Sequence, residues 1–361
     1  MFIMKKIIIL LLILLAVINI TSCSSDNIRD TLDDALLGNQ TNTDNEQIPD
    51  ALRSAYSYGL REGVFLDSYL STDVIVYGGE KIVFPFYYQN DRETYLETGL
   101  MMFINGIQQP FSVIQKDGET ISGIDMYSLE LNGNEYCEFD IEFEPLTGKI
   151  GETSEIFFHS LLFPKFGPTN DAFEGYLNYH KSVIMGALNI KFESQPYISK
   201  NFIENDYSEF EINMEIKSRF SMQLENDPDF FNATTIFEIS TDEDFQATTE
   251  RLAGEGCVTI HMRAFGGERT TYRTSLYVNH KRIKINGADY IDHIVQNDKG
   301  SQFSFVVDLG EADRYSTFYA ISTPISASLN EMWPNKINSH LLVNENVSRP
   351  NNEKPVPGLV A

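Results

Sequence analysis

The sequence predicts an all-β protein built from two tandem antiparallel β-sandwich domains, preceded by a signal peptide and a flexible tether. Three observations support this fold class. Short apolar runs alternate with period two, turn residues separate them about every 8–12 residues, and the second half repeats the pattern of the first. Hydrophobic residues make up 42% of the 361-residue chain, which is enough to form a core.

The N-terminus has the order of an export signal. Lys5 and Lys6 precede an unbroken run of 12 apolar residues, from Ile7 to Ile18. This run is shorter than the roughly 20 residues needed to span a bilayer, but it suits the apolar part of a signal peptide. Ile20-Thr21-Ser22-Cys23 follows: an aliphatic residue, two small residues and a cysteine.

These four residues resemble the lipobox of bacterial lipoproteins. The resemblance implies that residues 1–22 are removed and that the Cys23 thiol carries a diacylglycerol. Two or three acyl chains anchor stably, so we expect a lipid-anchored protein on the extracytoplasmic side of the cell membrane or outer membrane. Ser24 gives no signal for retention at an inner membrane. The alternative is an ordinary secretory signal that contains a cysteine by chance.

Charge and cysteine content restrict the partners. The formal net charge is −25, so nucleic acid is excluded as a ligand, because phosphate binding requires a basic patch. Contact with anionic lipid through the protein surface is disfavoured for the same reason. Cys137 and Cys257 are expected to be buried free thiols, with one disulfide as the alternative. Neither has a Cys or His at zinc-ligand spacing.

Residues 23–47 are expected to form a lipidated, flexible tether. Ile28, Leu32 and Leu36 recur at helical spacing, which allows one short amphipathic helix. Residues 38–47 contain no apolar side chain and should hold the globular part away from the bilayer. Pro49-Asp50 could then begin a brief helix that continues to Tyr58.

The first sandwich is expected over residues 48–195. Alternating apolar residues predict strands at Val74–Val76, Ile82–Tyr88 and Phe139–Phe143, and a longer strand at Ile156–Phe163. Asn105-Gly106 between two apolar runs predicts a hairpin with a type I′ turn, because both residues tolerate positive φ. A further hairpin is expected over 183–192, with Gly186 near its turn.

Residues 196–206 are expected to connect the first sandwich to a second one at 207–347, followed by a loose tail at 348–361. Phe210, Ile212, Met214 and Ile216 alternate, which predicts a strand over 210–216. This part of the chain thus begins with the same period as the first.

The repeat is visible at one offset of 174 residues. Val258, Ile260 and Met262 match Phe84, Phe86 and Tyr88, while Leu276–Asn279 matches Met102–Asn105 with His280 in place of Gly106. After a deletion of ten, Phe303, Phe305 and Val307 match Phe139, Ile141 and Phe143, and Phe318–Ile321 parallels Phe157–Ser160. Two sandwiches of immunoglobulin-like size would follow, with weak resemblance to tandem sandwich proteins of the cell surface. Generic alternation is the competing explanation.

Candidate sites are sparse. The motifs of serine hydrolases, nucleotide-binding loops and His-x-x-x-His metal sites are absent, and no cofactor is indicated. His159 and His261 lie in apolar strands, where outward-facing or hydrogen-bonded residues are more common than ligands. Acidic loops at Glu225–Asp229 and Asp242–Asp244 could bind calcium, with solvated turns as the alternative. Tyr176, Tyr179 and Trp333 could stack on a ligand, with core packing as the alternative.

We therefore expect a membrane-anchored, non-catalytic protein that binds or scaffolds an unknown protein or glycan outside the membrane. The alternative is a glycan-binding module or a glycan-active enzyme of the cell envelope. With 52 acidic residues, the sequence cannot select the carboxylate pair that glycoside hydrolysis requires.

Overall fold

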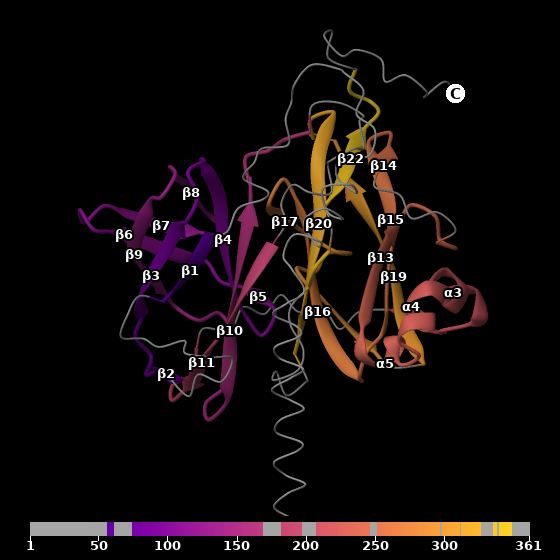
Figure 1. Ribbon diagram of the computed structural model, residues 1–361, viewed down its shortest axis with the longest axis horizontal. Helices are drawn as coiled ribbons and strands as arrows, with labels where there is room; N and C mark the ends of the chain where they lie inside the picture. The colour runs from indigo at the N-terminus through magenta and orange to yellow at the C-terminus, as the bar shows by residue number, and fades with distance from the viewer. Residues whose placement is uncertain are drawn as a thin grey trace, which may run out of the picture. The chain divides into compact units, whose positions relative to one another are not determined.

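The computed structural model describes residues 56–60, 74–168, 182–196, 207–245, 251–296, 298–310, 312–325, 335–337 and 339–348. All of them belong to one compact unit, Pro49–Ala361. Nearly all regular structure in these ranges is β-strand, and the strands form four sheets (Figure 1). The predicted all-β sandwich fold is therefore confirmed.

The first sandwich consists of sheets A and B. Sheet A has the order β1-β3-β9-β6-β7, with β1 Tyr56–Leu60, β3 Ile82–Asn90, β9 Tyr136–Phe143, β6 Phe111–Gln115 and β7 Thr120–Ile124. Sheet B has the order β2-β11-β10-β4-β5, and β8 also pairs with β4; its strands are β2 Val74–Tyr77, β11 Ser182–Phe192, β10 Thr153–Leu162, β4 Leu96–Ile104, β5 Ile107–Gln108 and β8 Tyr127–Leu131. Only the β2–β11 pair in this sandwich is parallel.

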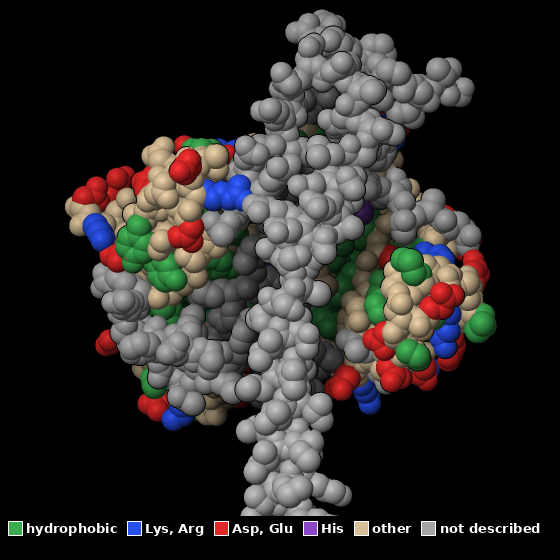
Figure 2. All heavy atoms as spheres, in the orientation of Figure 1, with side chains coloured by type: hydrophobic (Ala, Val, Ile, Leu, Met, Phe, Trp, Pro, Cys, Tyr) green, Lys and Arg blue, Asp and Glu red, His purple; other side chains and the backbone are tan. Residues whose placement is uncertain are grey.

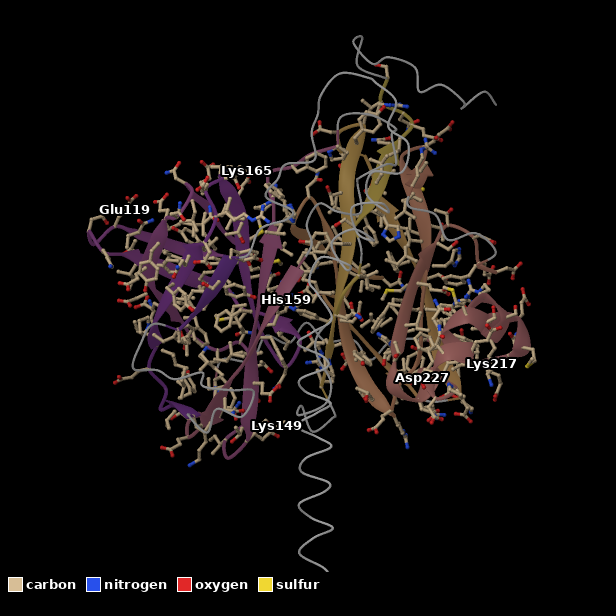
Figure 3. All side chains as sticks on the ribbon, in the orientation of Figure 1. Glu119, Lys149, His159, Lys165, Lys217 and Asp227 are labelled. Carbon is tan, nitrogen blue, oxygen red and sulfur yellow. The ribbon has the colours of Figure 1, made fainter. Side chains whose placement is uncertain are left out.

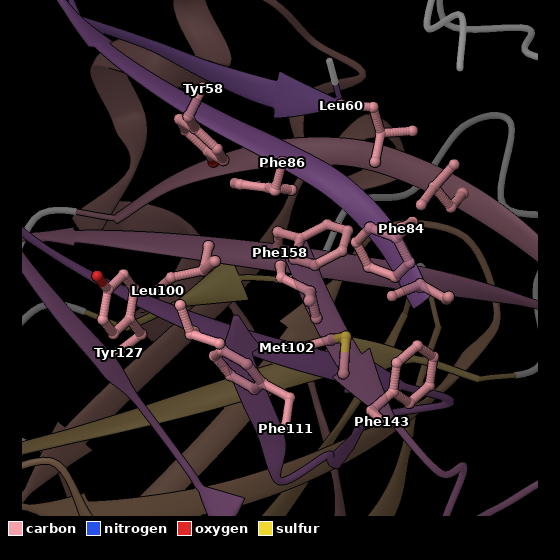
Figure 4. Close-up of a cluster of buried hydrophobic side chains, with 14 of the residues drawn as sticks. Tyr58, Leu60, Phe84, Phe86, Leu100, Met102, Phe111, Tyr127, Phe143 and Phe158 are labelled. Carbon is pink, nitrogen blue, oxygen red and sulfur yellow. The ribbon is translucent and has the colours of Figure 1, made fainter. Parts of the chain in front are cut away.

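The core of the first sandwich lies between the inner faces of sheets A and B. Phe86 and Phe158 approach from opposite sheets, with ring centroids 5.1 Å apart. Figure 4 shows the surrounding side chains, which include Tyr58, Leu60, Phe84, Leu100, Met102, Phe111, Tyr127 and Phe143. Each fully buried side chain of this kind contributes about 1.5–3 kcal/mol to the free energy of unfolding. The alternating apolar residues of the sequence therefore hold the two sheets together.

The second sandwich consists of sheets C and D. Sheet C has the order β12-β19-β15-β13, with β12 Ser208–Glu211, β19 Lys299–Asp308, β15 Cys257–Gly266 and β13 Thr235–Ser240. Sheet D has the order β14-β22-β20-β16-β17, with β18 on β16 and β21 on β20; its strands are β14 Arg251–Gly254, β22 His340–Asn344, β20 Tyr315–Pro324, β16 Thr270–Val278, β17 Lys281–Ile283, β18 Ile291–Val295 and β21 Asn335–Lys336. Every described strand thus pairs within its own half of the chain.

The strand order repeats between the two sandwiches. In sheets B and D the first strand of the sheet, β2 or β14, pairs parallel with its last strand, β11 or β22. The hairpin strand, β4 or β16, carries two partners on one side, β5 with β8 or β17 with β18. In sheet A, β6 pairs with β9, whereas in sheet C the short β12 pairs with β19. A strand from a different part of the chain therefore flanks β19 in the second sandwich.

The hairpin turns confirm the equivalence of β4 and β16. Asn105 and Gly106 have φ of 49° and 72°, and Asn279 and His280 have φ of 46° and 64°. Both turns thus place two successive residues in the left-handed region, as a type I′ turn requires. The Asn105 side chain donates to Ser154 Oγ at 3.0 Å, and the Asn279 side chain donates to Ser316 Oγ at 3.1 Å. His therefore replaces Gly without changing the turn type.

Two details of the predicted repeat are wrong in register. Ile104 pairs with Ile156, and Val278 pairs with Phe318, so Phe318 corresponds to Ile156 rather than to Phe157. A one-residue shift moves a side chain to the other face of the sheet, and alternation alone does not fix it. Likewise Phe84 pairs with Ile141 while Val258 pairs with Val307, so the β3 and β9 matches disagree by two residues.

Three predicted elements differ from the structure. Residues 182–192 form one strand, β11, and not a hairpin; its pairing with β10 shifts register opposite residues 156–158, which is a β-bulge. The strand predicted over 210–216 ends at Glu211, and helix α3 (Met214–Arg219) follows. Tyr56–Tyr58, placed at the end of a brief helix, belong to β1.

The prediction that both cysteines are buried is wrong. Cys137 and Cys257 are free, but Cys257 is exposed at the start of β15 and Cys137 is half-buried. The predicted connection at 196–206 lies outside the described residues apart from Pro196, as does the tether at 23–47. The tail at 348–361 is likewise outside, except for Ser348.

The two sandwiches contact each other through equivalent faces of sheets B and D. Phe103 and Tyr277 each lie two residues before their turn asparagine, and both belong to one buried cluster; its other members are Met101, Phe157, Leu161, Tyr319 and Ile321. Polar contacts accompany it. Tyr277 OH donates to Gln108 Oε1 at 3.2 Å, and Arg273 donates to the carbonyl oxygen of Asn105 at 3.1 Å. The described sandwiches are therefore fixed to each other by a partly polar core.

Among the residues described, no helix is both long and apolar enough to cross a membrane.

Candidate functional site: the α3 pocket

Three short helices distinguish the second sandwich: α3 Met214–Arg219, α4 Ser221–Asn226 and α5 Phe230–Ala233 (Figure 1). The described part of the first sandwich contains no helix. Helix α3 begins where the Asn213 side chain accepts a hydrogen bond from the backbone N–H of Ile216 at 3.0 Å. Ile216, in the first turn of the helix, and Ile212, just before the Asn213 cap, are both buried in the same cluster.

The helical segment packs on the outer face of sheet C. Phe265, from β15, is buried beneath it together with Ile212, Ile216 and Phe231. Its outer side carries apolar and charged groups together: Met214 and Met222 are 79% and 67% exposed, and Figure 2 shows hydrophobic and acidic side chains side by side over this region. Lys217 and Asp227, labelled in Figure 3, lie on the same segment.

A pocket of about 480 Å³ lies between this segment and sheet C, and we call it the α3 pocket. Its residues come from β12, α3, the turn after β13, β15 and β19, and are Phe210, Glu211, Asn213, Glu215, Ile216, Arg219, Glu243, Asp244, Phe245, Arg263 and Gln302. A volume of this size is within the range of small-molecule sites. The pocket is thus built where the helices are added to the repeated scaffold.

Arg263 is the central polar residue of the α3 pocket. Its side chain is 8% exposed, and its Nε donates to Glu238 Oε2 at 2.6 Å. Glu238 also accepts two bonds of 2.9 Å from Arg219, so one carboxylate serves two guanidinium groups. Burial lowers the pKa of Arg263 below its usual value, and Glu238 offsets only part of this effect. The guanidinium nevertheless stays charged at ordinary pH.

The Nη groups of Arg263 make no hydrogen bond to the residues that the structure describes. Guanidinium nitrogens are donors only, so these N–H groups can bind acceptor atoms of a ligand in the pocket. The Arg263 guanidinium carbon lies 4.2 Å from the centroid of the Phe245 ring, which is a cation–π distance. The donor is thus held in place by a carboxylate on one side and a ring on another.

Phe245 adopts a strained conformation. It has a φ of 53°, although it is neither glycine nor asparagine, and only 1% of its surface is exposed. A bulky residue in the left-handed region costs about 1–3 kcal/mol and persists only when its surroundings fix it. Here the Phe245 N–H donates to the Asp242 carbonyl oxygen at 3.1 Å. Such strain often occurs at ligand sites, where it positions a side chain.

Acidic residues line the outer part of the α3 pocket. Glu211, Glu215, Glu243 and Asp244 are all exposed. Half-buried Gln302 donates from its side chain to the Glu243 carbonyl oxygen at 3.4 Å. The pocket therefore combines donor groups on its inner wall with acceptor groups on its rim.

The site residues predicted from the sequence are only partly within the described structure. Cys23, Tyr176, Tyr179 and Trp333 lie outside the described residues. The Asp242–Asp244 loop does contribute to the α3 pocket, although it was singled out for calcium. Within the described ranges, which include both acidic loops, no group of three or more His, Cys, Asp or Glu residues could hold a metal ion.

The two histidines singled out in the sequence, His159 and His261, do not line the α3 pocket. His159 is buried and packs edge-on against Phe103 at 5.2 Å, and His261 is hydrogen-bonded to Ser304 Oγ at 2.7 Å. Sequence reasoning did not find Arg263, because one arginine in an apolar strand carries no motif. The available signal was an arginine at a strand position flanked by Met262 and Ala264, which point into the core.

No family model matches the chain, and no curated protein is similar to it in sequence. Solved structures give matches of low similarity. The Salmonella enterica SafA pilin in complex with the SafB chaperone is 8% identical, with a TM-score of 0.22 over 80% of this chain and 96% of that chain. The Pseudomonas aeruginosa CupB2 chaperone is 9% identical, with a TM-score of 0.20 over 74% and 96%. Similarity at this level carries no inference about what this chain binds.

Proposed function

We propose that this protein is a non-catalytic binding module anchored by lipid on Cys23 to the extracytoplasmic side of a membrane, and that its ligand binds in the α3 pocket. The lipobox resemblance supports the anchor, and the apolar-free stretch at 38–47 supports a tether that holds the sandwiches away from the bilayer. The absence of hydrolase and nucleotide-loop motifs in the sequence favours binding over catalysis.

The observation that carries the proposal is the contact between Phe245 and Arg263. A strained, buried ring and a buried guanidinium hold each other at the wall of a pocket, and the guanidinium keeps its Nη donors in addition to its cross-strand bond to Glu238. Functional groups commonly lie beside segments added to a rigid scaffold, and here the α3–α5 segment forms one side of the pocket that Arg263 and Phe245 line.

Two measurements test the proposal. Metabolic labelling with an alkyne fatty acid should mark the wild-type protein and not Cys23→Ser, which should leave the membrane fraction. An intact mass showing cleavage elsewhere and no acyl group would reject the anchor.

The pocket is tested by thermal shift of the mature chain with a panel of neutral oligosaccharides, Lys- and Arg-rich peptides, acidic peptides and free amino acids. A ligand at 100 times its Kd stabilises by about 2.7 kcal/mol. At least one class should raise the melting temperature of the wild type but not of Arg263→Met. A panel in which no class does so would reject the α3 pocket as the binding site.

A further inference from the structure

We infer that the α3 pocket is built for a neutral, hydroxyl-rich ligand, namely a saccharide of two or three rings. This inference rests on the proposed function and names the ligand class for the same site. It follows from the arrangement of donors, acceptors and rings in the pocket.

The inner wall supplies donors. The Nη groups of Arg263 have no acceptor among the described residues, while its Nε is bound to Glu238. Glu238 neutralises one of the two positive charges of Arg219 and Arg263, and the four carboxylates at the rim outweigh the remaining one, so the wall offers directed N–H groups in a pocket that is not positive overall. A ligand oxygen without full negative charge matches such a wall.

The rim supplies acceptors. Glu211, Glu215, Glu243 and Asp244 are acceptor-only groups when ionised. An anionic ligand would be repelled by four carboxylates at the entrance, and a cationic ligand would meet Arg263 at the wall. A hydroxyl both donates and accepts, so a polyhydroxylated ligand can satisfy the rim and the wall at once.

Apolar surface and size favour rings. Of the apolar residues that line the same pocket, Phe210 is half-buried and can present its ring to the C–H face of a sugar, whereas Ile216 and Phe245 are buried and shape the wall. A volume of about 480 Å³ exceeds what a single free amino acid would fill, although an amino acid could also pair with Arg263 and the acids. Size therefore favours a ligand of two or three rings over a single amino acid.

The test is a glycan array of neutral oligosaccharides, with and without calcium, followed by calorimetric Kd measurement on the full mature chain. Arg263→Met should weaken binding at least tenfold. Methionine has nearly the same side-chain volume as arginine, and Glu238 retains its two hydrogen bonds from Arg219, so the variant should remain folded. Glu243→Gln, at an exposed position, should weaken binding several-fold and provides an independent variant. Arg251→Met, which changes the charge equally at an ion pair in sheet D, should leave Kd within twofold.

Salt dependence separates the ligand classes. Binding of a neutral saccharide should change less than twofold between 50 and 500 mM NaCl, because no net charge is screened. If an acidic peptide binds instead, with an affinity that falls steeply with salt and with Arg263→Met, the saccharide inference is overturned while the proposed pocket stands. Free amino acids binding more tightly than any oligosaccharide would overturn it as well. If none of the probes binds in an Arg263-dependent way, both the inference and the pocket fail.

Discussion

Replacement of Gly106 by valine should destabilise both the hairpin turn and the contact between sandwiches. Gly106 has a φ of 72°, where a residue with a β-carbon costs about 1–2 kcal/mol. A β-carbon there would lie 2.8 Å from Arg273 Cβ and 3.2 Å from Thr323 Cβ, both in the second sandwich. Arg273 would have to move, and its 3.1 Å bond to the Asn105 carbonyl oxygen, worth about 1.5–3 kcal/mol as a charged bond, would be lost. The total is about 2.5–5 kcal/mol.

Differential scanning calorimetry of Gly106→Val should be compared with Gly118→Val. Gly118 also has positive φ, 88°, but a β-carbon there meets no atom within 4 Å. The control should therefore lose only the backbone cost of about 1–2 kcal/mol. Equal destabilisation by the two substitutions would refute the contact between the Asn105-Gly106 turn and the second sandwich.

Three further predictions concern single side chains. Burial lowers the pKa of His293 from 6.5 to about 3 in the folded state. The free energy of unfolding should therefore be highest above pH 6.5 and fall by up to about 1.4 kcal/mol per pH unit as the pH drops towards 3. In urea unfolding, the loss of stability between pH 7 and pH 5 should be smaller for His293→Gln than for the wild type, and an equal loss contradicts the assignment. Burial raises the pKa of Glu155 to about 7 in the folded state, so the wild type should lose stability as the pH rises from 4.5 through 7. Glu155→Gln should remove this loss, and a variant with the same dependence of stability on pH as the wild type would contradict the prediction. Phe158→Ala should cost about 3–5 kcal/mol by calorimetry, because Phe158 is fully buried in the first core; a cost below 1 kcal/mol would mean that the sheets do not pack as described.

Period-two alternation was sufficient to predict the sheets, because inner-face residues such as Phe84 and Ile260 must be apolar to hold two sheets together. The Asn105-Gly106 turn was predictable for a local reason, since few residues tolerate positive φ. His280 shows the limit of that rule: it occupies the same conformation, and its Nδ1 lies 3.0 Å from Tyr319 OH, a tertiary contact that no sequence pattern reveals.

Register and helix α3 required information from tertiary packing. Phe210, Ile212, Met214 and Ile216 fit a strand and, through Ile212 and Ile216, also a helix. The choice is made by the Asn213 cap and by burial against Phe265, which is distant in sequence. The α3 pocket was unpredictable for the same reason, because Arg263 becomes a ligand-binding candidate only when Glu238 and Phe245 are brought beside it.

The most direct test of the account is an NMR titration of the mature chain, labelled at arginine side chains, with a neutral oligosaccharide that scores on the array. If the α3 pocket is the binding site, the Arg263 Nε–H signal should shift the most and saturate with the calorimetric Kd, while that of Arg251, in sheet D of the same sandwich, should stay unchanged. Saturable binding that leaves the Arg263 signal in place would contradict the account, because the ligand would then bind elsewhere on the protein.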